Sequence, residues 1–126
     1  MTVSTFVIAP TYNSFYVDGD GKVEPPLDFV FNGVAATREC VTIPTVYYAD
    51  SSTTVIVGHV SDLENSAAPN YEGILATPQR QLVITETLSD IAAIKVENTE
   101  SYIRVWMNDT NEPDHVTIAW SDASTA

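Results

Sequence analysis

Apolar and polar side chains alternate along the last third of the chain, between Gln81 and Trp120. The alternation is strongest over Tyr102–Met107, and polar turns rich in Asn, Asp and Glu separate the apolar runs. A period of two places successive side chains on opposite faces of a β-strand, so the pattern predicts consecutive strands with one buried face. A slip of one residue would expose the whole buried row, which specifies the register. The predicted buried row is Leu82, Ile84, Ala92, Ile94, Val96, Ile103, Val105, Met107, Val116, Ile118 and Trp120.

Short apolar runs bounded by Gly, Pro, Asn and Asp continue through the rest of the chain, and no stretch longer than a turn has helical periodicity. Val34–Arg38 fits either a loop or one helical turn, and Ser61–Tyr71 indicates an exposed loop in which Asp62–Ser66 could form a helical turn. The sequence therefore predicts a single all-β domain over residues 1–126, an antiparallel β-sandwich or small barrel of jelly-roll or immunoglobulin-like type. The expected strands before the last third are Thr5–Ala9, Ser14–Val17, Leu27–Phe31, Cys40–Tyr48 (interrupted at Pro44), Thr53–Val60 and Gly73–Ala76.

The charge balance limits the partners that this chain can have. Its 126 residues include 17 acidic and 5 basic side chains, which gives a formal net charge of −12 at pH 7. Such a field repels phosphate backbones and anionic lipids, so it disfavours binding to nucleic acid or to a membrane surface. It favours solubility and a partner with basic patches. The alternative is a solvated acidic surface with no specific partner.

The N-terminus and the cysteine content bear on location and redox chemistry. Residues 1–5 lack a basic region followed by an apolar run, and no apolar stretch is long enough to span a membrane. We therefore predict a chain that is not secreted through a signal peptide. Cys40 is the one cysteine, so no intramolecular disulfide can form. We expect Cys40 to serve as a small buried apolar side chain.

Candidate catalytic residues are few. The two histidines, His59 and His115, are far apart in the sequence, and the chain has no nucleophile elbow, phosphate-binding glycine loop or zinc-type His–Cys cluster. His115 follows the acidic turn Glu112–Asp114, where a surface ion pair is the expected role. We predict no enzymatic activity, no catalytic residue and no cofactor.

Two acidic segments invite a comparison with calcium loops. Asp18–Gly21 has part of an EF-hand pattern, but aligning its glycine places Tyr16 and Leu27 where oxygen ligands are required. A hairpin turn is the better interpretation of this segment. Asn108–Asp114 offers several oxygen atoms, yet Asn and Asp are also common in turns for backbone reasons. We predict no metal site, and the sequence leaves calcium binding by Asn108–Asp114 open.

Four side chains are expected to share the solvent face of the last strands and are the predicted binding residues: Tyr102, Arg104 and Trp106 on one strand, and Lys95 on its neighbour. An outward Trp beside Arg and Tyr is typical of an interface anchor. The alternative is that Glu24–Leu27 or Ser61–Tyr71 covers Trp106, or that Arg104 stacks on it.

One part of the chain resembles a known family. The start Arg80–Ile84, followed by Ile94–Ser101 and a strand of alternating apolar residues, is similar to small β-sandwich proteins of tailed bacteriophage particles. The short acidic chain, rich in Thr, Ser, Val and Ala, is similar too. The resemblance implies a capsid decoration (cement) protein or another virion accessory subunit, located in the virion after assembly in the host cytoplasm. It assigns no functional residue.

We therefore expect a non-enzymatic structural or interaction protein with a protein partner, such as a capsid or other virion protein, and with self-association as a further expectation. Apolar and aromatic area, together with strand pairing at a free sheet edge, would supply the affinity, and Thr5–Ala9 is the best candidate for that edge. Two alternatives stay open. One is a carbohydrate-binding module that stacks sugars on Tyr102 and Trp106, and the other is an acidic inhibitor that blocks a basic active site.

Overall fold

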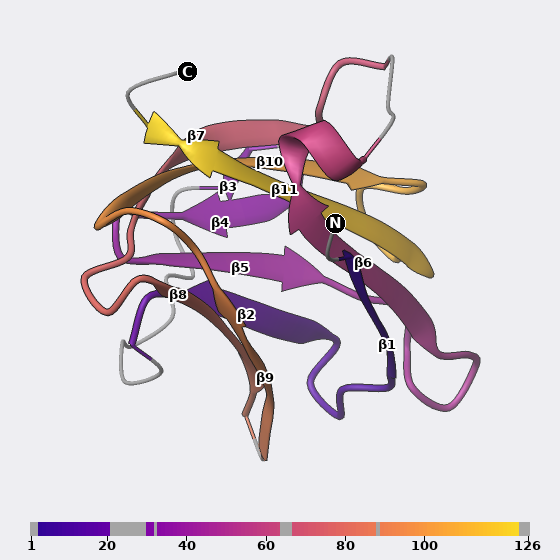
Figure 1. Cartoon of the computed structure of the whole chain (residues 1–126). Coiled ribbons are helices and arrows are strands. Elements are labelled where there is room, and N and C mark those ends of the chain that lie inside the picture. Colours follow the sequence, from indigo (N-terminus) through magenta and orange to yellow (C-terminus); the bar gives the residue numbers. More distant parts are fainter. Residues whose placement is uncertain (1–2, 21–29, 32, 64–66, 88, 124–126) are drawn as a thin grey trace.

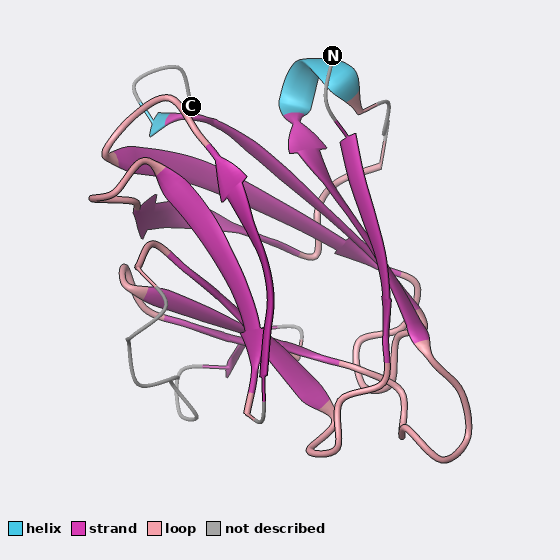
Figure 2. Cartoon of the chain, turned by 60° about the horizontal axis from the view of Figure 1, so that its bottom comes forward, coloured by secondary structure: helices cyan, strands magenta, loops and turns pink. Residues whose placement is uncertain are grey.

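The computed structural model describes residues 3–20, 30–31, 33–63, 67–87 and 89–123, which form two stacked β-sheets (Figures 1 and 2). The first sheet has, in spatial order, β1 (Val3–Ile8), β6 (Thr53–His59), β11 (His115–Asp122), β10 (Glu100–Met107) and β7 (Tyr71–Ala76). The second sheet has β3 (Val30–Phe31), β4 (Val34–Ala36), β5 (Cys40–Pro44), β2 (Ser14–Asp18), β8 (Gln81–Glu86) and β9 (Ser89–Lys95).

The strand orders confirm the predicted all-β sandwich and show two sheets that do not close into a barrel. Neighbouring strands pair antiparallel in both sheets with one exception, because β6 and β11 run parallel with Val116 opposite Val55. Of the predicted strand Leu27–Phe31, only Val30 and Phe31 lie within the described residues. No helix among the described residues is long and apolar enough to cross a membrane.

The core lies between the sheets and is built from the row that the alternation predicts. Nine of its members are at most 9% exposed: Leu82, Ile84, Val96, Ile103, Val105, Met107, Val116, Ile118 and Trp120. Ala92 and Ile94 are half-buried, because β9 is an edge strand with a neighbour on one side only. Burying side chains of this size stabilises the fold by about 1.5–3 kcal/mol each, so the two-residue period determines which face of each strand turns inward.

Two segments differ from the sequence-based expectation. Val34–Ala36 is a strand, not a loop or helical turn, because it pairs with β5 through Ala35 and Thr42. Before it, Gly33 has a φ of +86°, and a Cβ there would meet the Thr110 carbonyl oxygen at 1.9 Å, so this turn requires glycine. The other segment is Thr45–Tyr48, which forms no strand. The interruption expected at Pro44 occurs as the end of β5, because the proline has no N–H for the ladder.

The loop after β6 begins with a short 3₁₀ turn, η1 (Val60–Asp62). Of the predicted helical turn Asp62–Ser66, residues 64–66 lie outside the described residues. The described turn begins at Val60, and the His59 side chain caps it. His59 Nδ1 accepts a hydrogen bond from the Ser61 N–H at 3.1 Å. Figure 1 shows η1 leading from the end of β6 toward the segment that precedes β7.

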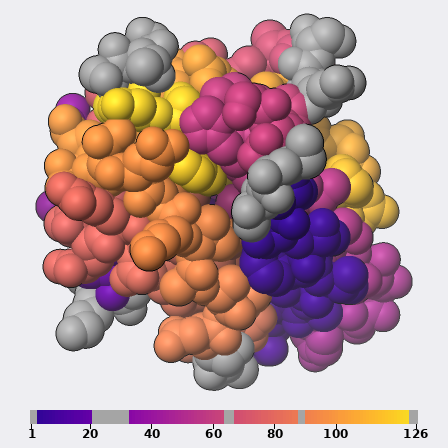
Figure 3. All heavy atoms as spheres, in the orientation of Figure 1, coloured from indigo at the N-terminus to yellow at the C-terminus, as the bar shows by residue number. Residues whose placement is uncertain are grey.

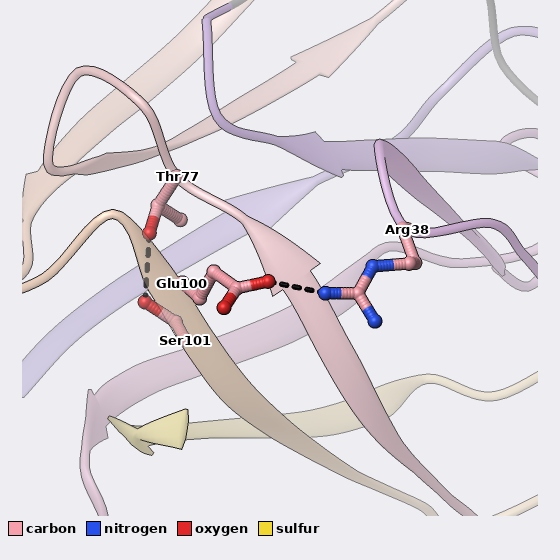
Figure 4. Close-up of polar contacts among 4 residues, drawn as sticks. All are labelled: Arg38, Thr77, Glu100 and Ser101. Atoms are coloured by element: carbon pink, nitrogen blue, oxygen red, sulfur yellow. Dashed lines mark hydrogen bonds and ion pairs between the residues drawn. The ribbon is translucent and has the colours of Figure 1, made fainter. Parts of the chain in front are cut away.

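Hydrogen bonds tie the two sheets together at one end of the sandwich (Figure 4). The Ala76 N–H donates to the Arg38 carbonyl at 2.6 Å, which joins β7 to the turn between β4 and β5. Arg38 also forms an ion pair with Glu100 at the start of β10. The hydroxyls of Thr77 and Ser101, both buried, are 3.1 Å apart. The two Arg38 contacts link β7 and the start of β10 to the second sheet, whereas the Thr77–Ser101 contact lies within the first sheet.

Candidate protein interface

Strand β10 has one buried face and one half-exposed face. Its inward residues belong to the core, whereas Tyr102, Arg104 and Trp106 point together to the outer side of the first sheet and keep part of their surface exposed. The structure therefore brings together three of the four predicted binding residues, through the period-two geometry of a single strand.

Lys95 does not join them. The prediction that it lies on the strand beside β10 is wrong, because the neighbours of β10 are β7 and β11, while Lys95 ends β9 in the other sheet. The sequence places β9 and β10 next to each other along the chain, which suggests a hairpin. The turn after Lys95 instead carries the chain from one sheet to the other, and β9 forms its hairpin with β8.

A connected set of contacts holds Tyr102 and Arg104. The guanidinium carbon of Arg104 lies 4.6 Å from the centre of the Tyr102 ring, a cation–π arrangement. The Tyr102 hydroxyl donates a hydrogen bond to the carboxylate of Glu72, which lies on β7 opposite Arg104 in the ladder. This hydrogen bond is the main reason that the pKa of Tyr102 is raised above its ordinary value, with smaller contributions from burial and from the Glu72 charge.

Trp106 is held by the segment just before β7. Its indole Nε1–H donates to the Ala67 carbonyl at 2.9 Å, and the Asn70 side-chain oxygen accepts from the Met107 N–H at 2.8 Å. The predicted alternative, in which Ser61–Tyr71 covers Trp106, therefore applies in part: the indole is anchored by this segment but stays half-exposed. Stacking of Arg104 on the indole does not occur, since Arg104 lies over Tyr102. The other segment proposed as a cover, Glu24–Leu27, lies outside the described residues.

A shallow hollow of about 370 Å³ lies beside the indole. It is bounded by the anchoring segment, by the ends of β10 and β11, and by the loop between them. Trp106 forms one of its walls, so a partner side chain could enter the hollow and contact the ring. The lining residues are Ala67, Ala68, Asn70, Trp106, Met107, Asn108, His115 and Thr117.

Two exposed carboxylates lie near these aromatic residues, and each has a cationic side chain beside it or paired with it. Glu72 and Glu100 lie on the same outer face of the first sheet and are exposed, and Glu100 pairs with Arg38. Acidic side chains are exposed across the rest of the described chain as well. The exposed ones are Asp20, Glu39, Asp50, Glu72, Asp90, Glu97, Glu100, Asp109, Glu112 and Asp114.

A second hollow, of about 550 Å³, opens between the two sheets where β1 and η1 face β9. Lys95 lies here, together with the imidazole of His59, whose ring meets the indole of Trp120 edge-on at 4.6 Å between centres. Apolar, polar and charged side chains line this hollow. Its lining residues are Ser4, His59, Ser61, Asp62, Ala93, Ile94, Lys95, Glu97 and Trp120.

The groups considered for catalysis are placed apart. His59 ends β6 and His115 begins β11, which are opposite ends of two parallel strands. The surface ion pair expected for His115 with Glu112 or Asp114 does not form, because the Asp114 carboxylate accepts from the side-chain amide of Asn108 at 2.6 Å. Cys40 is fully buried, as predicted, and burial is the main factor that raises the pKa of its thiol to about 12, with the charge of Asp18 adding to the shift.

The acidic loop between β10 and β11 uses its oxygens internally. Asn108 Oδ1 accepts from the backbone N–H groups of Asp114 and His115 at 3.1 and 3.2 Å. The Asp109 carboxylate accepts from the N–H groups of Asn111 and Glu112 at 3.2 and 2.7 Å. These contacts support the turn interpretation. Across the described residues, no three His, Cys, Asp or Glu side chains are grouped so that they could hold a metal ion.

Sequence reasoning did not find Glu72. Its signal is weak, because a single Glu near the start of a short strand is ordinary, and only the pairing of β7 with β10 places it beside Tyr102. The sequence also does not indicate that His59 and Trp120 line the hollow between the sheets, because this depends on the parallel pairing of β6 with β11.

Comparison with known proteins identifies the fold. No protein-family model matches the chain, and no curated protein sequence is significantly similar to it. The chain is similar in structure to ComJ from Bacillus subtilis, an inhibitor of the DNA degrading activity of NucA, with a TM-score of 0.69, 11% sequence identity and 93% of each chain covered. It is also similar to the crocagin biosynthetic gene J protein, with a TM-score of 0.56, 10% identity and 97% of each chain covered. At these identities the likeness establishes a shared sandwich fold over nearly the whole chain.

Proposed function

We propose that this chain is a non-catalytic protein that binds another protein, and that its partner is a cationic enzyme whose activity it blocks. The observation that carries the proposal is the outer face of β10 and β7, where two aromatic side chains are held in place among exposed carboxylates. Such a face supplies the anchors of a protein interface, and the net charge of −12 on the whole chain favours a basic partner.

The aromatic side chains suit the role of anchors because their positions are fixed before binding. Tyr102 is held by Glu72 and by Arg104, and Trp106 is held by the Ala67 carbonyl. Side chains that are already ordered lose less conformational entropy when a partner docks, so more of the contact energy contributes to affinity. The hollow beside Trp106 gives a partner side chain a place to pack.

The charge of the whole molecule supports a cationic partner. A net charge of −12 on 126 residues attracts basic proteins over a distance and repels acidic ones. This attraction is screened by salt, with a Debye length of about 8 Å at physiological ionic strength, so the association rate should fall as salt is added.

The shared fold favours a nuclease as the class of enzyme. ComJ, which has the same sandwich, inhibits the DNA degrading activity of NucA. An enzyme that cuts DNA must bind a polyanion, so its active-site cleft is basic. An acidic protein of this fold could occupy such a cleft and exclude the substrate.

A DNA-cleavage titration tests the proposal. Purified chain is added to cationic endonucleases, NucA among them, and plasmid cleavage is followed at increasing ratios of chain to enzyme. We expect cleavage to stop near one chain per enzyme for at least one nuclease and to recover as salt is raised. Full cleavage by every nuclease tested, with the chain in large excess at low salt, would contradict the nuclease assignment.

Two variants with equal charge change test which surface is used. Glu72→Lys reverses a charge beside Tyr102, and Asp90→Lys reverses an exposed charge on β9 of the other sheet. If the outer face of β10 and β7 docks on the enzyme, Glu72→Lys weakens inhibition by about tenfold or more and Asp90→Lys has little effect. Equal loss in both variants would indicate attraction by net charge alone.

The other roles expected from the sequence remain predictions. Binding to a capsid or other virion lattice, and location in the virion, rest on the resemblance to phage particle proteins. Stacking of sugars on Tyr102 and Trp106 has less support from the geometry, because Arg104 lies over the Tyr102 ring and Ala67 holds the indole edge. A titration with isolated phage capsids and a glycan array would test these two roles.

A further inference from the structure

The strands that end the two sheets differ in how they are protected against pairing with another chain. Edge strands expose unpaired backbone groups, and proteins usually shield them with charges, prolines, bulges or short length. β7 contains Glu72, β9 contains Asp90 and Lys95, and β3 is 2 residues long. β1 has 6 residues, Val-Ser-Thr-Phe-Val-Ile, with no charge, proline or glycine. In a chain with a net charge of −12, this is an unprotected edge.

The side chains of β1 fit a further strand on both faces. On the outer face, Val3 is 40% exposed and Val7 is 66% exposed, and these are the two exposed large aliphatic residues of the described chain. On the inner face, Phe6 and Ile8 pack against the core, while Ser4 lines the hollow between the sheets. Figure 3 shows atoms of β1 (indigo) beside atoms of β9 (orange). The inward side chains of a strand added beside β1 would point toward the hollow between the sheets.

We propose that β1 pairs antiparallel with β1 of a second copy of this chain, about a two-fold axis that passes next to Thr5. In antiparallel pairing, residues opposite each other lie on the same face, so Thr5 opposite Thr5 places Ser4 opposite Phe6 and Val3 opposite Val7. The two five-stranded sheets become one continuous sheet across the dimer.

This register matches large side chains with open space. Phe6 of the partner subunit lies opposite Ser4, at the mouth of the hollow where Ile94 and Trp120 provide apolar walls. The exposed Val3 of each copy covers Val7 of the other. Both contacts occur twice because the interface is isologous, and pairing closes the edge so that no further copy can add there.

The charge distribution favours a second copy as the occupant of this edge. The chain has 17 acidic and 5 basic side chains, so two copies repel each other wherever carboxylates would meet. β1 carries no charge, and its neighbour β6 (Thr-Thr-Val-Ile-Val-Gly-His) has no acidic or basic side chain other than His59. The paired strands therefore place no carboxylates opposite each other, and the acidic side chains of the adjoining hollow, Asp62 and Glu97, share it with Lys95.

The effect of salt distinguishes this dimer from the proposed binding to a cationic enzyme. Added salt screens the repulsion between two copies with equal negative charge, so it should tighten the dimer. The same salt should weaken binding to a basic enzyme. The dimer uses the β1 edge and the enzyme uses the outer face of β10 and β7, so either proposal can fail without the other.

Sedimentation equilibrium of the purified chain tests the dimer. We expect a monomer–dimer equilibrium in the micromolar to millimolar range that shifts toward dimer at higher salt. Val7→Lys, at an exposed position on β1, should abolish the dimer, and Thr5→Lys should do the same. Thr99→Lys adds the same charge at an exposed turn far from β1 and should leave the dimer intact. A monomer at every concentration and salt, or equal loss in all three variants, would overturn the proposal.

Cysteine cross-linking tests the register. Thr5→Cys should form an intermolecular disulfide under mild oxidation, because the two Cα atoms of an opposed antiparallel pair are about 4.5–5.5 Å apart, within the range that a disulfide spans. A mixture of Val3→Cys and Val7→Cys chains should form the mixed disulfide in preference to either homodimer. The parent chain, whose Cys40 is buried, should not cross-link. Absence of a cross-link from Thr5→Cys under conditions where the chain is dimeric would contradict the stated pairing.

Discussion

The two faces of β10 are held in place by different kinds of interaction. The inward residues Ile103 and Val105 are at most 1% exposed and are packed among apolar side chains from both sheets. The outward residues Tyr102, Arg104 and Trp106 are half-exposed and are held by a hydrogen bond to Glu72, a cation–π contact and a hydrogen bond to the Ala67 carbonyl. Burial of apolar area is non-directional, whereas each outward contact requires one particular partner atom.

This difference separates stability from recognition within one strand. Removing an inward side chain leaves a cavity and should lower the free energy of unfolding by several kcal/mol. Removing an outward side chain loses one polar contact that water can partly replace, so the unfolding free energy should change little. The outward face can therefore change its partner during evolution at small cost to the fold.

The largest expected effect comes from Ile103→Ala. Ile103 is 1% exposed, and its truncation should lower the free energy of unfolding by roughly 2–5 kcal/mol, measured by urea denaturation. Ile74→Ala is the matched control, because Ile74 lies on the half-exposed outer side of β7 opposite Tyr102. We expect it to cost less than half as much. Equal losses would mean that the two faces of the sheet do not differ in the way that the exposed areas indicate.

The next effect is a pH dependence caused by Cys40. Its thiol has a pKa of about 12 in the folded protein, against an ordinary value of 9.0. The folded state therefore keeps this proton where the unfolded state has lost it, so stability is fully present below about pH 9 and falls as the pH rises toward about 12. The expected loss is about 1.4 kcal/mol per pH unit within that window.

Urea denaturation at a series of alkaline pH values measures this loss. Tyrosines ionise in the same range, so the comparison is with Cys40→Ala, which lacks the thiol and keeps every tyrosine. The variant should be less stable than the parent at neutral pH and should lose stability more slowly as the pH rises. Identical slopes in the two proteins would show that the thiol does not carry the effect.

The contrast between the inward and outward faces of β10 also explains which features of the structure the sequence could predict. The period of two over Tyr102–Met107 places Ile103 and Val105 inside and Trp106 outside, and the structure agrees, because burial of a whole row depends only on the order of residues in that strand. The burial of Cys40, which the structure shows, is predicted on other grounds: its place at the start of an apolar strand and the apolar character of a free cysteine.

The contacts of the outer face could not be predicted in this way. Glu72 meets Tyr102 across 30 positions of sequence, and Ala67 meets Trp106 across 39. Lys95 was expected beside Arg104 because a short turn between strands suggests a hairpin, but a short turn can also carry the chain to the other sheet. Which strands become neighbours depends on the packing of the whole chain and is not present in any local pattern.

Trp106→Ala should have a smaller effect on stability than Ile103→Ala. The indole is half-exposed and makes one hydrogen bond to the Ala67 carbonyl, so we expect a loss of about 1–2 kcal/mol in the free energy of unfolding. Binding to an inhibited nuclease should weaken by about tenfold or more, measured by titration calorimetry. Trp106→Phe keeps an aromatic ring without the N–H donor, and its stability and binding should lie between those of the parent chain and those of Trp106→Ala. Unchanged binding with a stability loss as large as that of Ile103→Ala would make Trp106 a core residue.

The smallest expected effect comes from Glu72→Gln. The carboxylate of Glu72 accepts a hydrogen bond from the Tyr102 hydroxyl, and this hydrogen bond is the main reason that the pKa of Tyr102 is raised. A neutral amide oxygen is a weaker acceptor, so the pKa of Tyr102 should fall toward its ordinary value. The contact is on the surface, and the unfolding free energy should change by less than about 0.5 kcal/mol.

The absorbance of tyrosinate during alkaline titration measures this shift, but the chain has 6 tyrosines whose signals overlap. The difference between parent and Glu72→Gln must therefore be compared with the same difference in a Tyr102→Phe background. If Glu72 acts on Tyr102, Glu72→Gln lowers the pH at which tyrosine ionisation begins in the parent chain and has little effect in the Tyr102→Phe variant. A shift that persists without the Tyr102 hydroxyl would assign it to another tyrosine, with Tyr71 the first candidate because burial raises the pKa of Tyr71. The outer face of β10 would then lack the directed hydrogen bond that distinguishes it from the inward face.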